Sequence, residues 1–463
     1  MMPHATPLIA LFSALSVTAS PIGSLGGGNS KGLGLKPTTF SLDFAVHLNL
    51  TLGGKKIADL DRARAAEKLS AFSGDEEFSR RDGSIPSTNT GVTYVTSVGI
   101  GEPATYYSLV VDTGSSNTWL GANQSYVHTS SSTDLGKKVS VSYGSGRMSG
   151  NEYNDTVTLS SDLVITQQSI GVANTTQGFA GYDGILGLGP VNITSGTVDG
   201  EQYVPTVLNN LQDQGKISSE ILGVSFAPTT TQPNGNGVLN FGGPDSSKYT
   251  GDITYTPITT KRPANKYWGI DMAVNYGSSG RSLMNSTAGI VDTGSTLVLL
   301  PSDAFDIYTN TTGAASDYKT GLLKISEENY NKLESMYFEI GGSTFELTKN
   351  AQTFPRALNE FVGGDSDAIY LAVGDLGYES GRNGLDFILG YAFLERYYSV
   401  YDTTNSRVGF APTPTLTPFV LLPALETFIP HDLHSFCFFE VSAGSFGSYI
   451  ANAGHVHGLP LKS

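Results

Sequence analysis

The sequence predicts an all-β chain whose central part consists of two related halves. From about residue 90 to 412, short alternating or apolar runs such as TYVTSVGIG and YYSLVVD are broken by Gly, Asn, Asp and Pro, which is the pattern of strands and hairpins. The tetrapeptide Asp-Thr-Gly-Ser occurs twice, at 112–115 and 292–295. Each copy precedes an Asp-x-Ile-Leu-Gly segment, DGILGLG at 183–189 and DFILGYA at 386–392. The same two signals in the same order indicate two halves with related folds.

Few helices are expected in this region. VPTVLNNLQDQGKI, residues 204–217, has the composition of one helix, and PSDAFDIYTN, residues 301–310, opens with a Pro-Ser pair that favours a helix start. Gly, Ser, Thr, Asn and Tyr are abundant, which also favours a fold rich in strands and turns.

Length, charge and cysteine content limit the classes of function. A chain of 463 residues is long enough for two domains or one large bilobed unit. The net charge of −15 and the lack of a long basic run argue against nucleic acid as a partner. The single cysteine, Cys437, excludes a disulfide within the chain. We interpret it as a buried or unimportant thiol, with pairing to another chain as the alternative.

The N-terminus has the features of an export signal. LIALFSALSVTA, residues 8–19, is apolar, ends in small residues near Ala19 and is too short to span a membrane comfortably. A buried core segment and a membrane anchor are the alternatives. We therefore expect residues 1–19 to be a signal peptide and the protein to be secreted, although delivery to a vacuole uses the same entry signal.

Glycosylation sequons agree with export. Asn-x-Ser/Thr occurs at Asn49 in the N-terminal segment, and the candidates in the body are Asn123, Asn154, Asn174, Asn192, Asn285 and Asn310.

Residues 20–81 are predicted to be a propeptide, with an ordinary N-terminal domain as the alternative. Residues 1–81 hold nine Lys or Arg and seven Asp or Glu, a net of +2, which leaves −17 for the rest of a chain whose total is −15. The segment contains DRARAAEKLSAF, which has helical composition, and ends in the pair Arg80-Arg81, a candidate processing site. Low pH would protonate carboxylates on the body, weaken the attraction and release the segment.

The repeated turns place two acids in one setting. A two-fold relation between the halves would bring Asp112 and Asp292 face to face. Two carboxylates a few ångströms apart cannot both ionise easily, so they share one proton and their pKa values separate. One then acts as a base on a water molecule while the other protonates an amide carbonyl oxygen. The neighbouring turn residues can tighten the turns, bond across them and hold the carboxylates: Thr113, Gly114, Ser115, Thr293, Gly294 and Ser295.

Other catalytic arrangements fit the sequence poorly. Between His47 and His431 the only histidine is His128, in the polar loop SYVHTSSST, so a Ser-His-Asp or Cys-His site would depend on a loop residue that we interpret as solvated. The tail segments HDLH and HVH lack further ligands for a metal site, and we predict no metal and no cofactor. Paired carboxylates also serve glycosidases, but those do not need two copies of one turn. Solvated surface acids are the remaining alternative, and the apolar strands before each turn argue against it.

Over residues 92–412 the sequence resembles the pepsin family of aspartic proteases, most of all its cysteine-free secreted fungal members. The motifs that carry the resemblance are the two Asp-Thr-Gly turns, VSYGSGRMSG, LNFGGPDSSKYTGDITYTPI and YYSVYDTTNSRVGFAP. It implies a bilobed fold with an active-site cleft between pseudo-two-fold related lobes, 82–265 and 266–412. It also implies catalysis by Asp112 and Asp292, and strands threading behind each of them that pack closely at Gly187 and Gly390.

The resemblance further implies a β-hairpin flap over the substrate. The flap and substrate-binding residues would be Tyr143, Gly144, Ser145 and Trp119, with Trp119 hydrogen-bonding the tyrosine. Ser145 stands where some fungal relatives that accept Lys before the cleaved bond carry Asp, so we expect large apolar or aromatic residues to flank that bond. Only 31 residues separate Asp112 from Tyr143, and the family's small disulfide loop is missing there.

The resemblance therefore predicts a secreted acid endopeptidase made as a zymogen. Its partners would be protein and peptide substrates, its own propeptide as an inhibitor, and pepstatin-type inhibitors; we expect a monomer with no membrane partner. The sequence does not assign which Lys or Arg of the propeptide caps the two acids; Lys55 and Lys56 are candidates by position only, with a solvated surface role as the alternative. A binding protein that kept the fold and lost catalysis is the rival function, but such proteins usually change an aspartate, a turn residue or the flap tyrosine.

Residues 413–463 follow the last family motif. The apolar stretch after residue 413 is broken by Pro and acidic residues, so it predicts neither a clean membrane helix nor a lipid-anchor signal. We expect this extension to be disordered or an artefact of the gene model.

Overall fold

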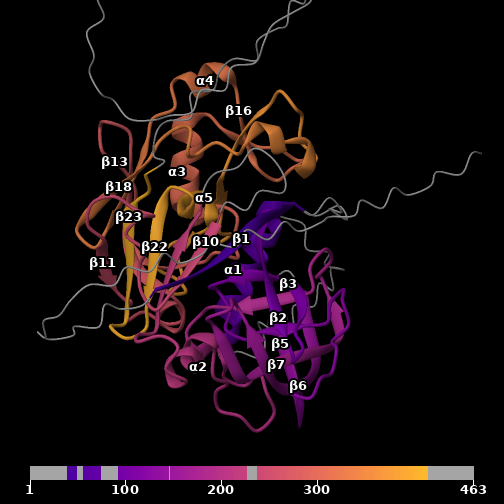
Figure 1. Cartoon of the computed structure of the whole chain (residues 1–463). Coiled ribbons are helices and arrows are strands. Elements are labelled where there is room, and N and C mark those ends of the chain that lie inside the picture. The colour runs from indigo at the N-terminus through magenta and orange to yellow at the C-terminus, as the bar shows by residue number, and fades with distance from the viewer. Residues whose placement is uncertain (1–38, 49–55, 74–91, 145, 227–236, 415–463) are drawn as a thin grey trace, which may run out of the picture. The chain divides into compact units, whose positions relative to one another are not determined.

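Strands dominate the part of the chain that the computed structural model describes, which comprises residues 39–48, 56–73, 92–144, 146–226 and 237–414 (Figure 1). This confirms the predicted all-β class. The chain divides into the units Met1–Pro418 and Phe419–Ser463. The predicted signal peptide and all but the first two residues of the C-terminal extension lie outside the described residues.

The largest sheet has 13 strands in the order β11-β23-β22-β9-β10-β1-β2-β3-β8-β4-β7-β6-β5. It combines strands from both ends of the chain, because β22 pairs antiparallel with β9. Its strands, in chain order, are β1 (Phe40–Leu48), β2 (Val92–Ile100), β3 (Thr105–Asp112), β4 (Trp119–Leu120), β5 (Thr133–Tyr143), β6 (Gly146–Thr158), β7 (Val164–Gln177), β8 (Gly184–Gly187), β9 (Ile221–Ser225), β10 (Gly237–Phe241), β11 (Thr254–Pro257), β22 (Tyr397–Asp402) and β23 (Arg407–Pro412).

A second sheet of seven strands has the order β18-β17-β12-β13-β21-β14-β20, and a small third sheet has the order β15-β16-β19. The strands of the second sheet are β12 (Gly269–Tyr276), β13 (Arg281–Val291), β14 (Val298–Leu300), β17 (Met336–Ile340), β18 (Ser343–Leu347), β20 (Val373–Asp375) and β21 (Ile388–Leu389). Those of the third are β15 (Ala315–Ser316), β16 (Leu323–Ile325) and β19 (Ile369–Leu371).

Both large sheets contain the same four-strand arrangement, which is the internal repeat predicted from the two pairs of motifs. In the first sheet β8 runs parallel to β3 and antiparallel to β4, which is itself parallel to β7. In the second sheet β21 runs parallel to β13 and antiparallel to β14, which is parallel to β20. Each Asp-Thr-Gly-Ser turn therefore leaves a strand that the Ile-Leu-Gly strand of its own half supports.

Glycine stands at the end of both supporting strands, as the last residue of β8 and directly after β21, because the neighbouring turn passes very close. A Cβ atom on Gly187 would lie 2.4 Å from the backbone carbon of Ser116, and one on Gly390 would lie 2.4 Å from the carbonyl oxygen of Leu297. No side chain fits at these distances, which is the close packing expected at both positions.

The described helices are few and short, with one exception. The helices predicted near residues 204–217 and 301–310 are present as α2 and α3, and the helical composition of the N-terminal segment corresponds to α1. α2 begins with a capping box between Thr206 and Asn209, and α3 ends at Gly313, whose φ of 70° closes the helix. The helices are α1 (Ile57–Ser73), α2 (Val207–Asp213), α3 (Ser302–Thr312), α4 (Glu327–Asn331) and α5 (Tyr391–Leu394).

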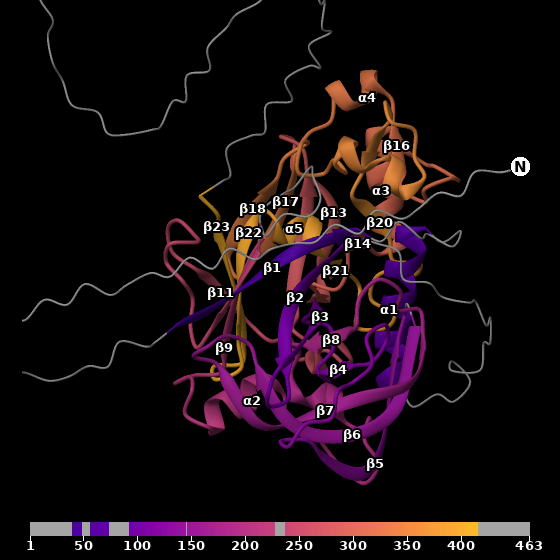
Figure 2. The same ribbon diagram turned by 45° about the vertical axis from the view of Figure 1, so that its right-hand side comes forward.

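The predicted propeptide supplies two elements that pack on the body. β1 lies between β10 and β2 in the large sheet, with Phe40 opposite Phe241 and Ala45 opposite Val95. α1 contacts β5 of the first sheet and β20 of the second, and Figure 2 shows it at the right-hand side of the described chain, near β20. Of the helices in the described ranges, none is long and apolar enough to cross a membrane.

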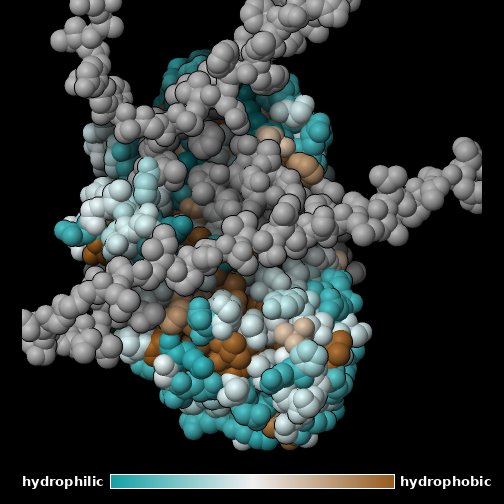
Figure 3. All heavy atoms as spheres, in the orientation of Figure 1, coloured by the Kyte–Doolittle hydropathy of each residue, from teal (hydrophilic) through white to brown (hydrophobic). Residues whose placement is uncertain are grey.

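The core continues from sheet to sheet and is rich in aromatic rings. Phe44 of β1 packs edge-on against Tyr94 and Phe226, with ring centroids 5.3 and 5.1 Å apart. On the face drawn in Figure 3, hydrophilic residues cover much of the described surface over the strands β5 to β7, with small hydrophobic patches between them.

Candidate active site

Asp112 and Asp292 are buried at equivalent places in the two halves. Asp112 is the last residue of β3, and Asp292 directly follows β13. Their exposed fractions are 7% and 0%. The apolar residues before each aspartate carry it to the end of a core strand, so the interpretation of these acids as solvated surface residues is wrong.

The threonines of the two turns bond to each other across the halves. The backbone N–H of Thr113 donates to Oγ1 of Thr293, and the N–H of Thr293 donates to Oγ1 of Thr113, both at 3.0 Å. Oγ1 of Thr293 also donates to the carbonyl oxygen of Val111 at 3.1 Å, and Oγ1 of Thr113 to that of Val291 at 3.4 Å. These buried reciprocal bonds fix the two turns against each other.

Each carboxylate is held by its own turn in the same way. Ser115 Oγ donates to Asp112 Oδ2 at 2.5 Å, and Ser295 Oγ donates to Asp292 Oδ2 at 2.7 Å. The glycine N–H that follows each threonine donates to the other oxygen, at 3.0 Å for Asp112 Oδ1 and 2.9 Å for Asp292 Oδ1. Both carboxylates are thereby fixed in orientation before any substrate binds.

The two turn glycines let the carboxylates approach one another. A Cβ atom on Gly114 would lie 2.5 Å from Asp292 Oδ1, and one on Gly294 would lie 2.5 Å from Asp112 Oδ1. Each glycine therefore faces the carboxylate of the other half, and a side chain at either position would separate the pair.

The two carboxyl groups differ in their affinity for a proton. Burial, together with the negative charge of Asp292, raises the pKa of Asp112. Burial also acts to raise the pKa of Asp292, but the charges of Lys68 and Arg64 outweigh it, so that this pKa is lowered. Of the two carboxyl groups, Asp112 therefore holds a proton more strongly than Asp292.

Lys68 of α1 reaches the pair of acids from the predicted propeptide. Its Nζ donates to the carbonyl oxygen of Gly114 at 2.6 Å and lies 3.6 Å from Asp292 Oδ2. It also lies 5.2 Å from the centre of the Tyr267 ring. Because Lys68 is only 5% exposed, its charge is desolvated and directed at the two aspartates.

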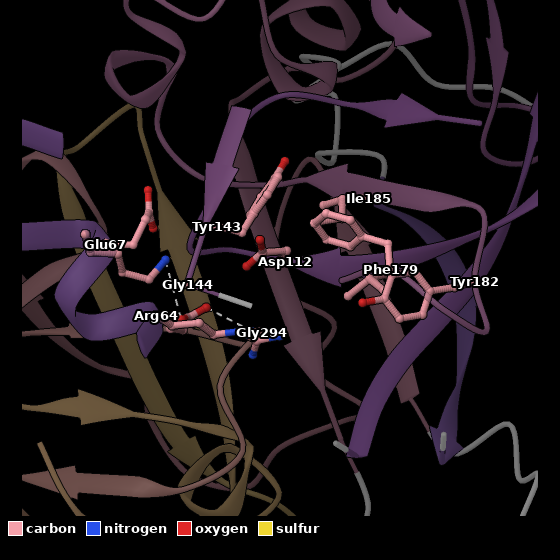
Figure 4. A pocket seen from close by; sticks show the side chains of 12 residues that line it. Arg64, Glu67, Asp112, Tyr143, Gly144, Phe179, Tyr182, Ile185 and Gly294 are labelled. Carbon is pink, nitrogen blue, oxygen red and sulfur yellow. Dashed lines mark hydrogen bonds and ion pairs between the residues drawn. The ribbon is translucent and has the colours of Figure 1, made fainter. Parts of the chain in front are cut away.

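Asp61, two turns earlier in α1, fixes the helix to the second half. Asp61 Oδ2 accepts hydrogen bonds from the N–H groups of Thr296 and Leu297, at 2.9 and 2.8 Å, directly after the second turn. Its other oxygen lies 3.9 Å from the guanidinium of Arg64. Figure 4 shows Arg64 and Glu67 projecting from α1 on one side of Asp112.

Tyr143 and Trp119 meet as the resemblance implies. Trp119 Nε1 donates to the Tyr143 hydroxyl at 2.7 Å, and Tyr143 ends the strand β5 that forms a hairpin with β6. Gly144 lies against α1, because a Cβ there would be 2.0 Å from the backbone nitrogen of Arg64. Ser145 lies outside the described residues.

An apolar wall stands on the far side of Asp112 from α1 (Figure 4). Phe179 packs edge-on against Trp119 and Tyr143, with ring centroids 4.8 and 5.4 Å away. The pocket around the two acids combines this wall with the α1 side chains, and the residues that form the wall are Val110, Phe179, Tyr182 and Ile185.

The lysine at the acids is one that the sequence reasoning missed. Lys55 lies outside the described residues, and Lys56 instead stands 4.1 Å from the centre of the exposed Tyr318 ring. In an α-helix, Asp61, Arg64 and Lys68 fall on one face. That spacing within the helical segment was the available signal, because it places a carboxylate and two cations on the face that meets the acids.

The sequons occupy different environments. Asn154 is half-buried within β6, and Asn49 lies outside the described residues. The exposed candidates are Asn123, Asn174, Asn192, Asn285 and Asn310. Among the described residues, no three His, Cys, Asp or Glu side chains are grouped so that they could hold a metal ion.

Comparisons with known proteins agree with this geometry. Residues 93–413 match the family described as eukaryotic aspartyl protease. Polyporopepsin from Irpex lacteus is 59% identical over 337 residues, which cover 72% of this chain and 98% of that protein. Gastricsin from Cavia porcellus is 31% identical over 344 residues, 70% of this chain and 82% of that protein.

A solved structure shows the same fold. The crystal structure of the aspartic proteinase from Irpex lacteus matches with a TM-score of 0.71 and 51% sequence identity, and it covers 82% of this chain and 99% of that one. With the family match over most of the chain, the conclusion is that this chain belongs to the pepsin-like aspartic proteases, a family of endopeptidases.

Proposed function

We propose that Asp112 and Asp292 are the catalytic pair and that they hydrolyse peptide bonds in acid through an activated water. The observation that carries the proposal is the matched hydrogen bonding of two buried carboxylates, each facing the glycine of the opposite turn. Once the cations of α1 are gone, the two groups share one proton because both cannot ionise at such close range.

The chemistry follows from that shared proton. The ionised carboxylate takes a proton from water as its oxygen attacks the carbonyl carbon, and the protonated carboxyl group donates to the carbonyl oxygen. The pair still holds one proton when the tetrahedral diol has formed. The protonated carboxyl group donates it to the amide nitrogen, the C–N bond breaks, and a hydroxyl group of the diol returns a proton to the pair as the carboxylic acid product forms. No covalent bond forms between enzyme and substrate, and the threonine bonds across the halves keep the pair rigid throughout.

The flap and the apolar wall support a preference for large apolar or aromatic residues beside the cleaved bond. Val110, Phe179, Tyr182 and Ile185 offer an apolar surface next to Asp112. The bond from Trp119 holds the hydroxyl of Tyr143, so that this ring can close over a bound peptide without rotating into solvent.

The chain is made as a zymogen in this proposal, with residues 20–81 as the propeptide. Three contacts of α1 support it: Lys68 on the pair of acids, Asp61 on two amide N–H groups of the second half, and the backbone of Arg64 against Gly144. While α1 stays in place, no peptide can reach the aspartates.

Export completes the proposal. The apolar residues 8–19 and the exposed sequons are those of a secreted glycoprotein. Delivery to a vacuole is the alternative destination, and one relative, 30% identical over 352 residues, bears the name vacuolar aspartic protease, from Candida albicans.

Cleavage of denatured globin between pH 2 and 7, after incubation in acid, tests the catalytic pair. We expect activity that peaks in acid, is abolished by pepstatin and falls by at least about a thousandfold in both Asp112→Asn and Asp292→Asn. Asp306→Asn, an exposed acid on α3, is the matched control and should cleave like the wild type. A folded, processed wild type that cleaves at no pH would favour the rival binding function.

A further inference from the structure

The carboxylate of Asp375 lies beside α1 on the C-terminal half. Asp375 ends β20, which runs parallel to β14 with Asp375 opposite Leu300. β14 begins directly after Leu297, whose N–H binds Asp61 of α1. Leu300 lies three positions after Leu297, which corresponds to about 10 Å along a strand. Asp375 is thus placed along the line that α1 follows, away from the catalytic pair.

One oxygen of Asp375 is fully used by its own half. Oδ1 accepts hydrogen bonds from Ser302 Oγ at 2.7 Å and from the N–H of Gly377 at 2.8 Å. These bonds orient the carboxylate without α1 and leave Oδ2 and the backbone carbonyl oxygen toward the helix. The group is a preorganised acceptor, because its position does not depend on the propeptide.

An arginine of the propeptide occupies this acceptor. Arg62 Nε donates to the Asp375 carbonyl oxygen at 3.2 Å, and its NH2 lies 4.0 Å from Oδ2. The side chain passes over Gly377, where a Cβ atom would lie 2.9 Å from Arg62 Cδ and where φ is +98°. The glycine gives the aliphatic part of the arginine a flat surface, while the Asp375 carbonyl oxygen accepts a hydrogen bond from Nε and the Asp375 carboxylate adds a long ion pair. The third guanidinium nitrogen, NH1, donates to Asp59 of α1 itself at 3.2 Å.

We propose that Asp375 forms a subsite for a basic substrate residue, arginine above all, once α1 has left. The inference rests on the proposed endopeptidase function and adds a preference to it. The departing Arg62 leaves a carboxylate oxygen, a carbonyl oxygen and a flat glycine surface open to whatever lies in the cleft. A substrate in extended conformation advances about 3.3 Å per residue. Its basic residue would therefore lie several positions from the cleaved bond. It would be about three residues beyond the substrate residue that lies over Leu297.

Matched peptides test the subsite on the full chain after activation in acid. Each peptide carries the same apolar pair at the cleaved bond, with arginine, citrulline or glutamate placed in turn at every position from the second to the fifth on each side. Citrulline keeps the shape of arginine without its charge. We expect kcat/KM to favour arginine over citrulline about fivefold at one position, as suits a half-exposed ion pair.

Variants locate the effect. Asp375→Asn, whose amide oxygen can still accept from Ser302 and Gly377, should reduce the arginine-to-citrulline ratio to about one, and Asp375→Lys should favour glutamate at the same position. Asp306→Asn removes an acid from α3 and should leave the ratio at about five. An active wild type without an arginine preference at any position, or equal ratios in wild type and Asp375→Asn, would overturn this inference alone. A wild type that cleaves none of the peptides would overturn the endopeptidase function as well.

Discussion

The two Asp-Thr-Gly-Ser turns are nearly the same in geometry and different in charge. Each aspartate accepts from a serine and a glycine of its own turn, and the threonines exchange equivalent bonds. Yet only Asp292 has a lysine at 3.6 Å, and only its pKa is lowered. The difference does not come from the repeated halves. It comes from α1, which lies outside the repeat, so a symmetric pair of acids is held in an asymmetric state while α1 is bound.

A second difference between the halves concerns the residue that lies seven positions after each aspartate. Seven residues after Asp112 is Trp119, which bonds Tyr143 of the flap hairpin, whereas seven residues after Asp292 is Leu299, a buried residue of β14. The chemistry of the site therefore depends on the shared features of the halves, and its control depends on the features that only one half has. The predictions below separate these two groups.

The threonine bonds should be of equal importance on both sides. Thr113→Val removes the acceptor of the Thr293 N–H, and Thr293→Val removes that of the Thr113 N–H, which leaves a buried donor unpaired in each case. We expect each change to lower the free energy of unfolding by about 2 kcal/mol, as measured by denaturant unfolding. A large cost for one threonine and none for the other would contradict the symmetry of the turns.

The flap contact should matter in one half only. Trp119→Phe removes the donor to the Tyr143 hydroxyl while retaining an aromatic ring, and we expect kcat/KM to fall about fivefold, since one buried hydrogen bond accounts for about 1 kcal/mol. Leu299→Met, a substitution of similar volume at the equivalent position of the other half, is the control. Peptide cleavage that falls equally in both variants would show that the effect is one of packing.

Two groups of carboxyl groups should change the stability of α1 docking in opposite directions as the pH rises. Because the pKa of Asp292 is lowered, its pairing with Lys68 stabilises the docking of α1 at pH values above 3.8, the ordinary pKa of an aspartate. This stabilisation is lost as the pH falls through the lowered pKa of Asp292. Burial raises the pKa of both Asp61 and Glu67 to about 7. Their contribution to docking is fully present below their ordinary values of 3.8 and 4.5 and is lost as the pH rises to about 7.

Docking should therefore be tightest in mild acid and weaker on both sides of it. The lowered pKa of Asp292 acts in the direction of the sequence-based expectation that acid weakens the attraction, and the raised pKa values of Asp61 and Glu67 act in the opposite direction. Hydrogen exchange of α1 across pH 3 to 8 measures this. In Asp61→Asn and Glu67→Gln the loss of protection toward neutral pH should shrink, and protection that rises steadily from pH 4 to 8 in the wild type would contradict the assignment.

Most of the features that could be predicted from the sequence were predicted from local sequence patterns. The paired turns, the supporting Ile-Leu-Gly strands and the helices α2 and α3 follow from short stretches whose residue types are tied to their conformation. The apolar run before Asp112 also indicated that this acid is buried. These features depend on neighbours in the chain, which the sequence displays directly.

Contacts between distant segments escaped prediction. Lys68 reaches Asp292 because Asp61 binds amide groups more than 200 residues away and because Gly144 admits the helix backbone. β1 lies in the large sheet between β2 and β10, although its sequence, FSLDFAVHL, does not predict with which strands it pairs. The register of one segment on another is set by tertiary packing, and a single sequence shows only which faces are suited to it.

The activity of the unprocessed chain tests most directly whether Lys68 of α1 creates the difference between the two turns. Lys68→Met and the matched control Lys56→Met, which lies on Tyr318, would be compared with the wild type in cleavage of a short fluorogenic peptide at pH 5.5, with chain length followed by mass spectrometry. We predict that the wild type and Lys56→Met stay latent until they are cut, and that Lys68→Met cleaves at least about tenfold faster while still intact. An intact Lys68→Met chain as latent as the wild type would contradict the account.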